Sequence, residues 1–398
     1  MIVRSARPYE YDAVLDLIRG AFPTGDAASI IAAATIRDDP AFQPDQLRVA
    51  EHEGQIIGAI NLIDRQVHIG TATARCLIVA PLATAPEHQG KGIGSALMLD
   101  ALDWATDRGF LLSMLWGHPW LYPRYGYAPG IKSYVVKLPA SADPLGDGAY
   151  TLRAATAADA PALLKVYHAE TAHATLAEAR TAEPWEWRPH QQATTIEVAV
   201  DPARAVRGYM RVTPDKDRLR VGEVYARDTG AAQALFDRLI YLARQHRADI
   251  EATATPDNRW SKLALQRGAQ VCVGSGGGAG MVRVLNFPAL LRAIDSELRR
   301  RVARSELVAE RAAVRIETPV GRATIEIDHG DVVINDSRTA NTVALPFHAL
   351  GPLISGYGGI EELRGVSGVF VRGNGTERLL DVLFPEGYPH WSFAAYFS

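Results

Sequence analysis

The 398-residue sequence has few cysteines, no excess of basic charge and no long apolar run. Its two cysteines, Cys76 and Cys272, stand too far apart to supply a disulfide framework or a Cys-x-x-Cys metal site, which favours a reducing compartment. The 42 Lys and Arg residues against 45 Asp and Glu residues give a formal net charge of −3. Because binding to a phosphate backbone draws on a basic excess, we expect no nucleic-acid partner.

Signals for membrane insertion, export and metal binding are missing as well. The most apolar run, residues 76–86, has about half the length of a membrane span and contains two prolines, so it predicts a buried strand. The N-terminal segment turns polar at once and lacks the apolar core of a signal peptide. The 11 histidines form no His-x-His or His-Glu-x-x-His pattern, so we expect no metal. We therefore expect a cytoplasmic protein without a membrane partner.

Length predicts two or three domains, because one domain holds about 150 residues. Residues 2–4 predict a strand, and apolar positions spaced by three and four between Val14 and Phe22 predict a helix. The elements expected next are strands at 47–53, 56–66 and 76–84, a helix from Gly90 to Asp107 and a strand at 111–116. This order predicts an α/β layer in which a helix begins directly after a central strand.

Around residue 150 the pattern begins again. Residues 152–155 echo residues 3–6, and strands near 196–200, 205–212 and 219–225, a helix at 231–245 and a strand at 249–255 follow in the same order. Residues 225–232 hold one glycine where residues 89–94 hold three. We therefore predict an internal repeat whose second copy shares the fold without a cofactor.

The pattern changes again after residue 280. Strands at 281–285, 315–317, 322–328 and 332–335 accompany a helix from Pro288 to about Val302 and helical pieces at 349–354 and 360–363. The Arg-rich residues 297–304 (ELRRRVAR) are interpreted as a solvated helix face. We divide the chain into a first domain at 1–145, a second at 146–283 and a third at 284–398, and the fold class is α/β (α+β).

One motif carries chemistry. Residues 89–95 (QGKGIGS) follow a strand and open an amphipathic helix, so backbone N–H groups and the helix dipole converge on one point. Glycines let the oxygens of a pyrophosphate approach the backbone closely. The turn is not a Walker A loop, because Lys91 is followed by Gly92 rather than by Ser or Thr.

The Gln-x-x-Gly-x-Gly pattern at Gln89–Gly94 resembles the acetyl-coenzyme A signature of the GNAT acetyltransferase superfamily. Residues 117–127 (GHPWLYPRYGY) resemble the family's "YYxRFGF" segment, and the resemblance covers roughly residues 1–140. In its whole-chain organisation the sequence is similar to the Eis (enhanced intracellular survival) acetyltransferases. That similarity implies two tandem GNAT-like mixed-sheet domains, the second degenerate, and a sterol carrier protein-like C-terminal domain whose C-terminus reaches the active site.

The resemblance implies an N-acetyltransferase that uses acetyl-coenzyme A and transfers its acetyl group directly to a primary amine. It implies that Tyr122 protonates the departing thiolate, and a phenol of pKa near 10 suits a thiolate of pKa about 8.5. It also implies that the terminal carboxylate of Ser398 is the base, with His118 or an ordered water as the alternative. The implied cofactor contacts are Leu82, Ala83, Thr84, Gln89, Gly90, Lys91, Gly92, Ile93, Gly94, Ser95, Gly117 and His118.

The acceptor is left open between an aminoglycoside, another small amine and a lysine side chain. Phe22 and Asp26, with Asp38 and Asp39 as further acids, are candidates for contacting it. The family resemblance also implies that the protein forms a homo-oligomer, which we expect to be a hexamer. The alternative from a different class is a module that senses acetyl-coenzyme A or binds an apolar ligand with little catalysis.

Overall fold

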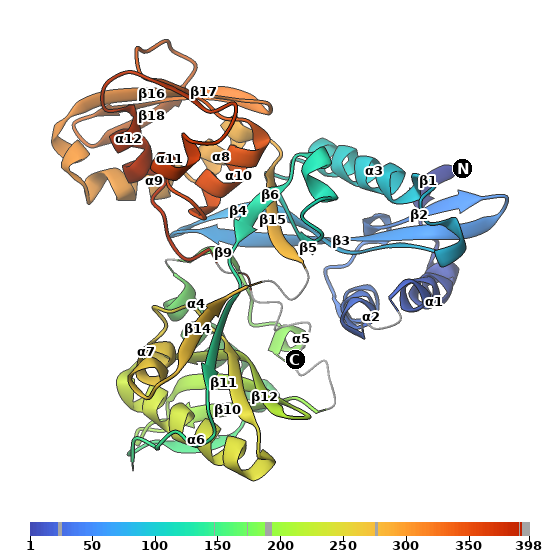
Figure 1. The fold of residues 1–398 in the computed structure, drawn as a ribbon, viewed down its shortest axis with the longest axis vertical. Coiled ribbons are helices and arrows are strands. Elements are labelled where there is room, and N and C mark those ends of the chain that lie inside the picture. The colour runs from blue at the N-terminus through green and yellow to red at the C-terminus, as the bar shows by residue number, and fades with distance from the viewer. Residues whose placement is uncertain are drawn as a thin grey trace. The chain divides into compact units, whose positions relative to one another are not determined.

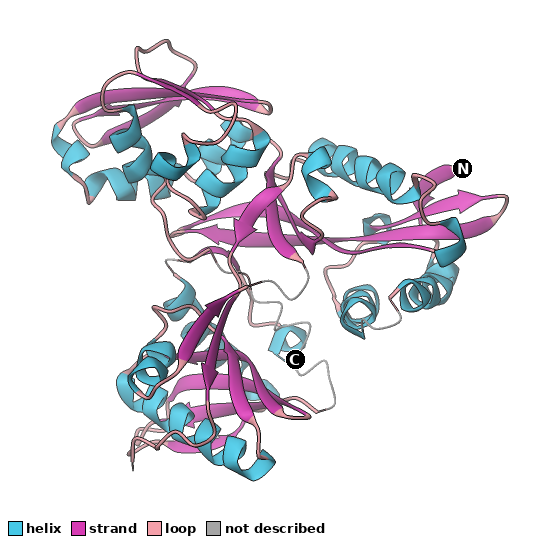
Figure 2. Ribbon diagram, in the orientation of Figure 1, coloured by secondary structure: helices cyan, strands magenta, loops and turns pink. Residues whose placement is uncertain are grey.

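The computed structural model describes residues 1–22, 26–146, 148–172, 174–187, 193–274, 278–389 and 391. They form a mixed α/β structure with three sheets (Figures 1 and 2). The chain divides into two compact units, of which the first holds residues 1–131, 174–177 and 275–389. Within the described ranges, no helix has the length and apolarity needed to cross a membrane. The same ranges contain no group of three or more His, Cys, Asp or Glu side chains placed to hold a metal ion.

The first sheet has the strand order β1-β2-β3-β4-β5-β15-β6, and β9 also pairs with β3. Its strands are β1 (Ile2–Ser5), β2 (Leu47–His52), β3 (Gln55–Ile69), β4 (Ala72–Thr84), β5 (Leu112–Gly117), β6 (Ala128–Ile131), β9 (Thr175–Glu178) and β15 (Ala279–Val284). Helix α3 (Ile93–Asp107) covers one face, and α1 (Tyr11–Ala21) and α2 (Asp26–Ala33) cover the other (Figure 1). The predicted buried strand over residues 76–84 and the helix that follows it are thereby confirmed.

The predicted start of that helix is early by three residues. Gly90 and Gly92 have φ angles of +75° and +80°, which a right-handed helix cannot accommodate, so α3 begins at Ile93. Its apolar face, with Leu97 and Ala101 fully buried, packs on β3 and β4. The helix ends at the predicted stop, where Gly109 takes φ +71°.

The second sheet has the order β14-β7-β13-β12-β11-β10-β8. Its strands are β7 (Tyr134–Leu138), β8 (Thr151–Ala154), β10 (Thr195–Val200), β11 (Val206–Asp215), β12 (Arg218–Ala226), β13 (Asp249–Thr253) and β14 (Gln270–Val273). The helices of this part are α4 (Ala160–Thr171), α5 (Pro184–Trp187), α6 (Thr229–His246) and α7 (Arg259–Gln266). Strand β7 precedes the boundary that the sequence suggests at residue 145, yet it pairs with β13 and β14.

The third sheet has the order β18-β17-β16-β19-β20, and its helices lie on one face (Figures 1 and 2). The strands are β16 (Arg311–Thr318), β17 (Gly321–Asp328), β18 (Asp331–Asn335), β19 (Thr342–Ala344) and β20 (Phe370–Arg372). The helices are α8 (Phe287–Ala293), α9 (Asp295–Ala303), α10 (Phe347–Ser355), α11 (Ile360–Leu363) and α12 (Thr376–Leu383). The single helix predicted from Pro288 to Val302 is thus two helices that meet at Ile294.

The interpretation of residues 297–304 as a solvated face is wrong for Glu297, which is fully buried. Its carboxylate accepts hydrogen bonds from the backbone N–H and hydroxyl of Thr71, at 3.0 and 2.8 Å, and from Arg300 and Arg301. Thr71 lies in the β3–β4 turn, so this carboxylate joins helix α9 to the first sheet. A Cβ atom at position 70 would lie 2.2 Å from the same carboxylate, which explains why this residue is a glycine.

This junction should make stability depend on pH. Burial raises the pKa of Glu297, but the hydrogen bonds from Arg300, Thr71 and Arg301 outweigh burial and lower it from 4.5 to about 2. The stabilisation, on the order of 3 kcal/mol, is therefore present above pH 4.5 and is lost as the pH falls towards 2. Thermal unfolding between pH 7 and pH 3 should show a smaller acid-induced loss of stability in Glu297→Gln than in the wild type. Parallel curves for the two proteins would contradict the assignment.

Candidate active site

The site is a crevice where two parallel strands separate. β4 and β5 pair with each other from Cys76 with Leu112 to Val79 with Leu115. Beyond these residues β4 continues to Thr84 and β5 to Gly117, and in this fully described stretch the two strands no longer pair with each other. Ligands of α/β sheets bind where adjacent strands diverge at their carboxyl ends. A cavity of about 330 Å³ lies there. Of the predicted cofactor contacts, it is lined by Leu82, Thr84, Gln89, Gly90, Gly92, Ile93, Gly94 and Ser95.

The glycine turn presents open backbone to this cavity. A Cβ built on Gly90 or Gly92 would meet no described atom within 4 Å, so nothing on the protein side covers the turn. Gly92 is the N-cap of α3 and has no side chain to occupy the first-turn N–H groups of the helix. These N–H groups and the helix dipole together suit an anion such as a pyrophosphate.

Strand β4 offers its backbone rather than its side chains. Its residues 82–84 pair with Ile60, Ala59 and Gly58 of β3 along one edge, and the other edge borders the crevice. The side chain of Ala83 is buried in the core on the α1 and α2 side. Ala83 can therefore contact a cofactor through its backbone groups alone, and those groups suit the amides of an extended pantetheine arm.

Tyr122 begins a short helical turn, η5 (Tyr122–Tyr125), which residues 118–121 connect to the end of β5. Its ring lies over Gly117, because a Cβ there would come within 2.2 Å of the ring atom Cε2. The ring also meets Tyr127 edge to face at 6.2 Å between centroids. Burial, and to a lesser degree Tyr125, raises the pKa of Tyr122 to about 12. The phenol therefore keeps its proton throughout the physiological range.

The turn that carries Tyr122 is braced from two sides. The hydroxyl of Tyr125 donates to Ser95 Oγ at 2.7 Å, which ties η5 to the first turn of α3. The guanidinium of Arg283, in β15, donates to the carbonyl of Tyr125 and lies 5.1 Å from the ring of Phe347. A Cβ at Gly126 would come within 3.1 Å of Phe347, so helix α10 of the third sheet packs directly against the turn.

Other residues singled out in the sequence lie elsewhere. Lys91 is exposed and donates to the carbonyl of Glu87, and the exposed His118 stacks on Trp120 at 4.6 Å between ring centroids. Neither lines the cavity, nor does Gly117, which instead accommodates the ring of Tyr122. Ser398 lies outside the described residues.

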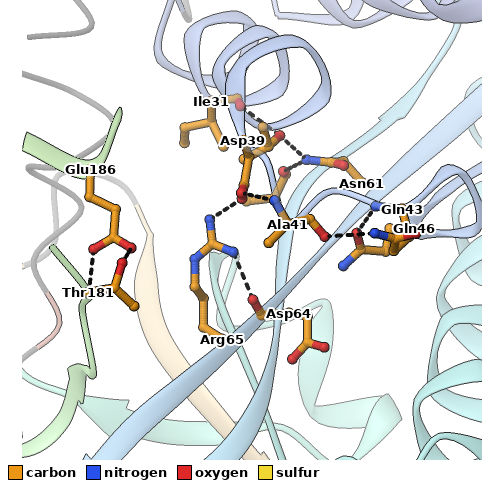
Figure 3. Close-up of polar contacts among 12 residues, drawn as sticks. Ile31, Asp39, Ala41, Gln43, Gln46, Asn61, Asp64, Arg65, Thr181 and Glu186 are labelled. Atoms are coloured by element: carbon orange, nitrogen blue, oxygen red, sulfur yellow. Dashed lines mark hydrogen bonds and ion pairs between the residues drawn. The ribbon is translucent and has the colours of Figure 1, made fainter. Parts of the chain in front are cut away.

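The candidate acceptor contacts are only partly described. Phe22 is half-buried and packs against the hydrophobic core that includes the buried side chains of helix α1. The backbone of Asp26 opens α2, whereas its side chain lies outside the described part of the chain. Asp39 is buried, and its carboxylate accepts from Arg65 at 2.5 Å and from the N–H of Ala41 at 2.8 Å (Figure 3). Asp39 therefore holds its own loop and β3 together, and both of its carboxylate oxygens are engaged within the protein.

A buried amide fixes the same region to the crevice. Asn61, on β3, donates to Thr35 Oγ1 at 2.7 Å and to the carbonyl of Ala80 at 2.9 Å, and Thr35 in turn donates to the carbonyl of Ile31. Asn61 and Ile31 are labelled in Figure 3. Ala80 lies one residue beyond the last β4 position that pairs with β5. The helical segment before residue 39 is thereby attached to the strand that forms one wall of the site.

Sequence reasoning did not assign four residues that line the cavity: His88, Leu121, Arg124 and Tyr125. His88 belongs to a short turn, η4 (Pro86–His88), and the other three lie beside or within η5. The Nε of Arg124 donates to the carbonyl of Leu121 at 3.0 Å, so this side chain fixes its own loop. The sequence could have pointed to these four residues only because they lie next to or near Gln89 and Tyr122 in the chain. Their residue types alone do not indicate a cofactor contact.

Residues 2–130 match the model of the acetyltransferase (GNAT) domain family. This segment is a GNAT acetyltransferase domain. The Escherichia coli protein named "Uncharacterized N-acetyltransferase YjhQ" is 32% identical over 109 residues, which are 27% of this chain and 60% of that protein. The chain thus matches less than two thirds of that relative's length. A second E. coli protein, "Uncharacterized N-acetyltransferase YhbS", is 26% identical over 127 residues, or 32% of this chain and 73% of that one.

Solved structures share the fold over the whole chain. A GCN5-related N-acetyltransferase from Kribbella flavida covers 98% of this chain and 97% of its own, at 20% identity and a TM-score of 0.75. A GCN5-related N-acetyltransferase from Anabaena variabilis covers 98% of both chains at 15% identity and a TM-score of 0.79. Eis1 from Mycobacterium abscessus covers 98% of this chain and 99% of its own at 19% identity and a TM-score of 0.67. The similarity to Eis1 thus extends to the third sheet.

Proposed function

We propose that this protein transfers an acetyl group from acetyl-coenzyme A to a primary amine: an aminoglycoside, another small amine or a lysine side chain. The observation that carries the proposal is the glycine turn at the mouth of the crevice between β4 and β5. Its uncapped helix N-terminus suits a pyrophosphate, and the backbone of residues 82–84 suits a pantetheine arm. The phenol ring of Tyr122 lies over Gly117, the last residue of β5, next to the cavity-lining residues Leu121 and Tyr125 in the sequence.

Each proposed catalytic group has one role. When bound, acetyl-coenzyme A supplies the thioester. Tyr122 holds a proton that it gives to the departing sulfur, and burial of the phenol keeps this proton in place throughout the physiological pH range. The terminal carboxylate of Ser398 is proposed to accept the amine proton, on the family resemblance alone. Equal turnover by C-terminally tagged and untagged protein would exclude that role.

We further propose a single coenzyme A site per chain. In the second sheet the turn between β12 and α6 carries Asp228, whose carboxylate accepts from the N–H of Ala231 at 2.9 Å and from the hydroxyl of Tyr150 at 2.9 Å. A Cβ at Gly230 would lie 2.5 Å from the ring of Tyr150. A fixed carboxylate and a covering ring thus occupy the helix N-terminus where a pyrophosphate would need to sit.

Binding of coenzyme A tests this proposal. Calorimetry should give one site per chain, and Gly92→Val should weaken binding about 10- to 100-fold, because a β-branched residue disfavours the left-handed turn and blocks close approach of the phosphates. The variant should stay folded, since Cβ at this position contacts no described atom. Gly109→Val, at another exposed left-handed glycine, is the matched control and should bind normally. Two sites per chain, or full affinity in Gly92→Val, would contradict the assignment.

Turnover then separates an enzyme from a sensor. Thiol release from acetyl-coenzyme A should appear with at least one member of a panel of aminoglycosides, aryl amines, polyamines and lysine peptides. Gly92→Val should lose that signal at limiting acetyl-coenzyme A. Tight coenzyme A binding without turnover on the whole panel would favour the module that only senses acetyl-coenzyme A.

A further inference from the structure

We propose that the second domain holds a separate site for a polyvalent phosphate, such as a triphosphate or a phosphate ester with several charges. The site is a cavity of about 420 Å³ between the start of α4, the turn joining β10 to β11, and the end of β12. Its charged lining consists of Arg153, Lys165, Arg204, Arg207, Arg227 and Asp159. The proposal is independent of the acetyl-transfer site.

Two of the cations are held in place by carboxylates. Arg153 makes two hydrogen bonds of 2.7 Å to Asp159, and Arg207 Nε donates to Asp201 at 2.7 Å. Asp201 also accepts from the N–H of Ala205 at 2.8 Å, so the same carboxylate shapes the β10–β11 turn. These two ion pairs fix one side of the cavity. Because each arginine is paired with a carboxylate, they add little net charge to it.

The other three cations carry the excess charge. Lys165, Arg204 and Arg227 line the cavity, and among the described residues none of them makes a side-chain hydrogen bond or ion pair. Arg204 adopts a φ angle of +65°, a left-handed conformation that a residue with a Cβ adopts at a cost in strain. Three unpaired cations around one cavity repel each other, and a bound polyanion relieves that repulsion.

Comparison with the first domain shows that this charge is not required by the fold. Arg153 pairs with Asp159 as Arg4 pairs with the carboxylate six residues after it. Arg153 follows Arg4 by 149 residues, and the same spacing places Lys165 at the position of Asp16. The corresponding helix position is therefore acidic in one copy and basic in the other.

Two strand positions around the cavity are also more basic in the second domain than in the first. The N–H of Arg227 donates to the carbonyl of Arg207 at 2.7 Å, and the N–H of Ala85 donates to the carbonyl of Ile57 at 3.0 Å in the equivalent place. Two arginines of the second domain thus stand where the first domain has an isoleucine and an alanine. The second domain therefore carries cations at positions around this cavity where the first domain has none.

The lining identifies the ligand class. Guanidinium groups present planar pairs of N–H donors that match phosphate oxygens, and a lysine adds a point charge. The remaining lining residues, Ala162, Ala205 and Val206, are small and not aromatic. We therefore infer recognition of the phosphate groups themselves rather than of a base attached to them.

Titration of the full chain with inorganic triphosphate tests the site. Gly92→Val serves as the background, so that the glycine turn of the first domain does not contribute. We expect one triphosphate per chain at low salt, with an affinity that falls as salt rises. Adding Lys165→Asp and Arg227→Ala, the residues found at the equivalent first-domain positions, should weaken binding at least tenfold. Lys262→Asp with Arg267→Ala makes the same charge change on helix α7 and the residue after it, outside the cavity, and should leave affinity within twofold.

Three results would overturn the proposal. One is the absence of saturable triphosphate binding below about 1 mM, and another is equal binding by the Lys165→Asp, Arg227→Ala protein and the control. The third is that ATP binds more than tenfold more tightly than triphosphate does, which would mean that the site recognises the nucleoside and not only the phosphates. Circular dichroism of each variant checks that the second domain remains folded. Because the assay uses neither coenzyme A nor an amine, failure of the acetyl-transfer proposal would leave its outcome unaffected.

Discussion

Tyr122→Phe is expected to lower the turnover of an accepted amine about 100- to 10,000-fold, the range typical for loss of a positioned general acid or base. The ring that packs over Gly117 and against Tyr127 is retained in this variant. No described residue hydrogen-bonds the Tyr122 hydroxyl, so stability and coenzyme A affinity should stay close to those of the wild type. Steady-state kinetics and calorimetry on the same preparations measure the two effects.

Tyr125→Phe is the matched control for that prediction. It removes the hydroxyl that donates to Ser95 at 2.7 Å, and loss of one such hydrogen bond costs about 1 kcal/mol. It should therefore lower stability slightly and turnover by far less than Tyr122→Phe does. A Tyr122→Phe protein with turnover within twofold of the wild type would eliminate the phenol as proton donor.

The same assignment predicts the alkaline side of the pH profile. A general acid works while it holds its proton, and the pKa of Tyr122 is raised to about 12. The wild type should therefore show no fall in kcat from loss of this proton until the pH approaches 12. A descending limb near pH 10, the usual pKa of a phenol, would mean that the working acid is an exposed tyrosine or another group.

Local patterns in the sequence were sufficient to predict much of the first domain. The glycine turn, helix α3 and strand β4 are consecutive, so periodicity and turn chemistry specify them without knowledge of distant partners. Most predicted contacts from this stretch do line the cavity. Lys91 does not, because its side chain folds back to the carbonyl of Glu87.

Contacts between distant segments account for what the sequence did not predict. Glu297 lies among arginines and so has the local pattern of a solvated helix, yet its partner Thr71 is 226 residues away. Strands β7 and β15 have ordinary strand patterns, but which sheet each joins depends on partners elsewhere in the chain. The cationic cavity of the second domain likewise draws on four separate segments.

The second domain also contains a buried charge network that its sequence pattern did not suggest. Glu223 is fully buried on β12 and accepts from Arg180 at 2.5 Å and from the hydroxyl of Tyr209 at 3.1 Å. The guanidinium of Arg211, also fully buried, lies 3.1 Å from the same carboxylate. Arg180 in addition lies 4.4 Å from the ring of Tyr167. Burial raises the pKa of Glu223, but the two guanidinium groups outweigh burial and keep it lowered.

Glu223→Gln should accordingly destabilise the protein by about 3 to 5 kcal/mol, the cost of leaving buried charges without their counter-ion. The glutamine keeps the shape of the side chain, so the loss reports on charge rather than on a cavity. Glu251→Gln, in a more exposed pair with Lys137 and Arg218, is the control and should cost less than about 1 kcal/mol. Urea unfolding of the three proteins measures the difference.

A third variant separates charge pairing from mere burial. Replacing Glu223, Arg180 and Arg211 together by leucine or methionine removes the carboxylate and both guanidinium groups of this network at once. Apolar replacement of a whole buried network is often neutral or stabilising, and we expect this protein to regain most of the stability that Glu223→Gln loses. If instead it is as unstable as Glu223→Gln, packing around Tyr167 and Tyr209, and not the balance of buried charge, determines the stability of this core.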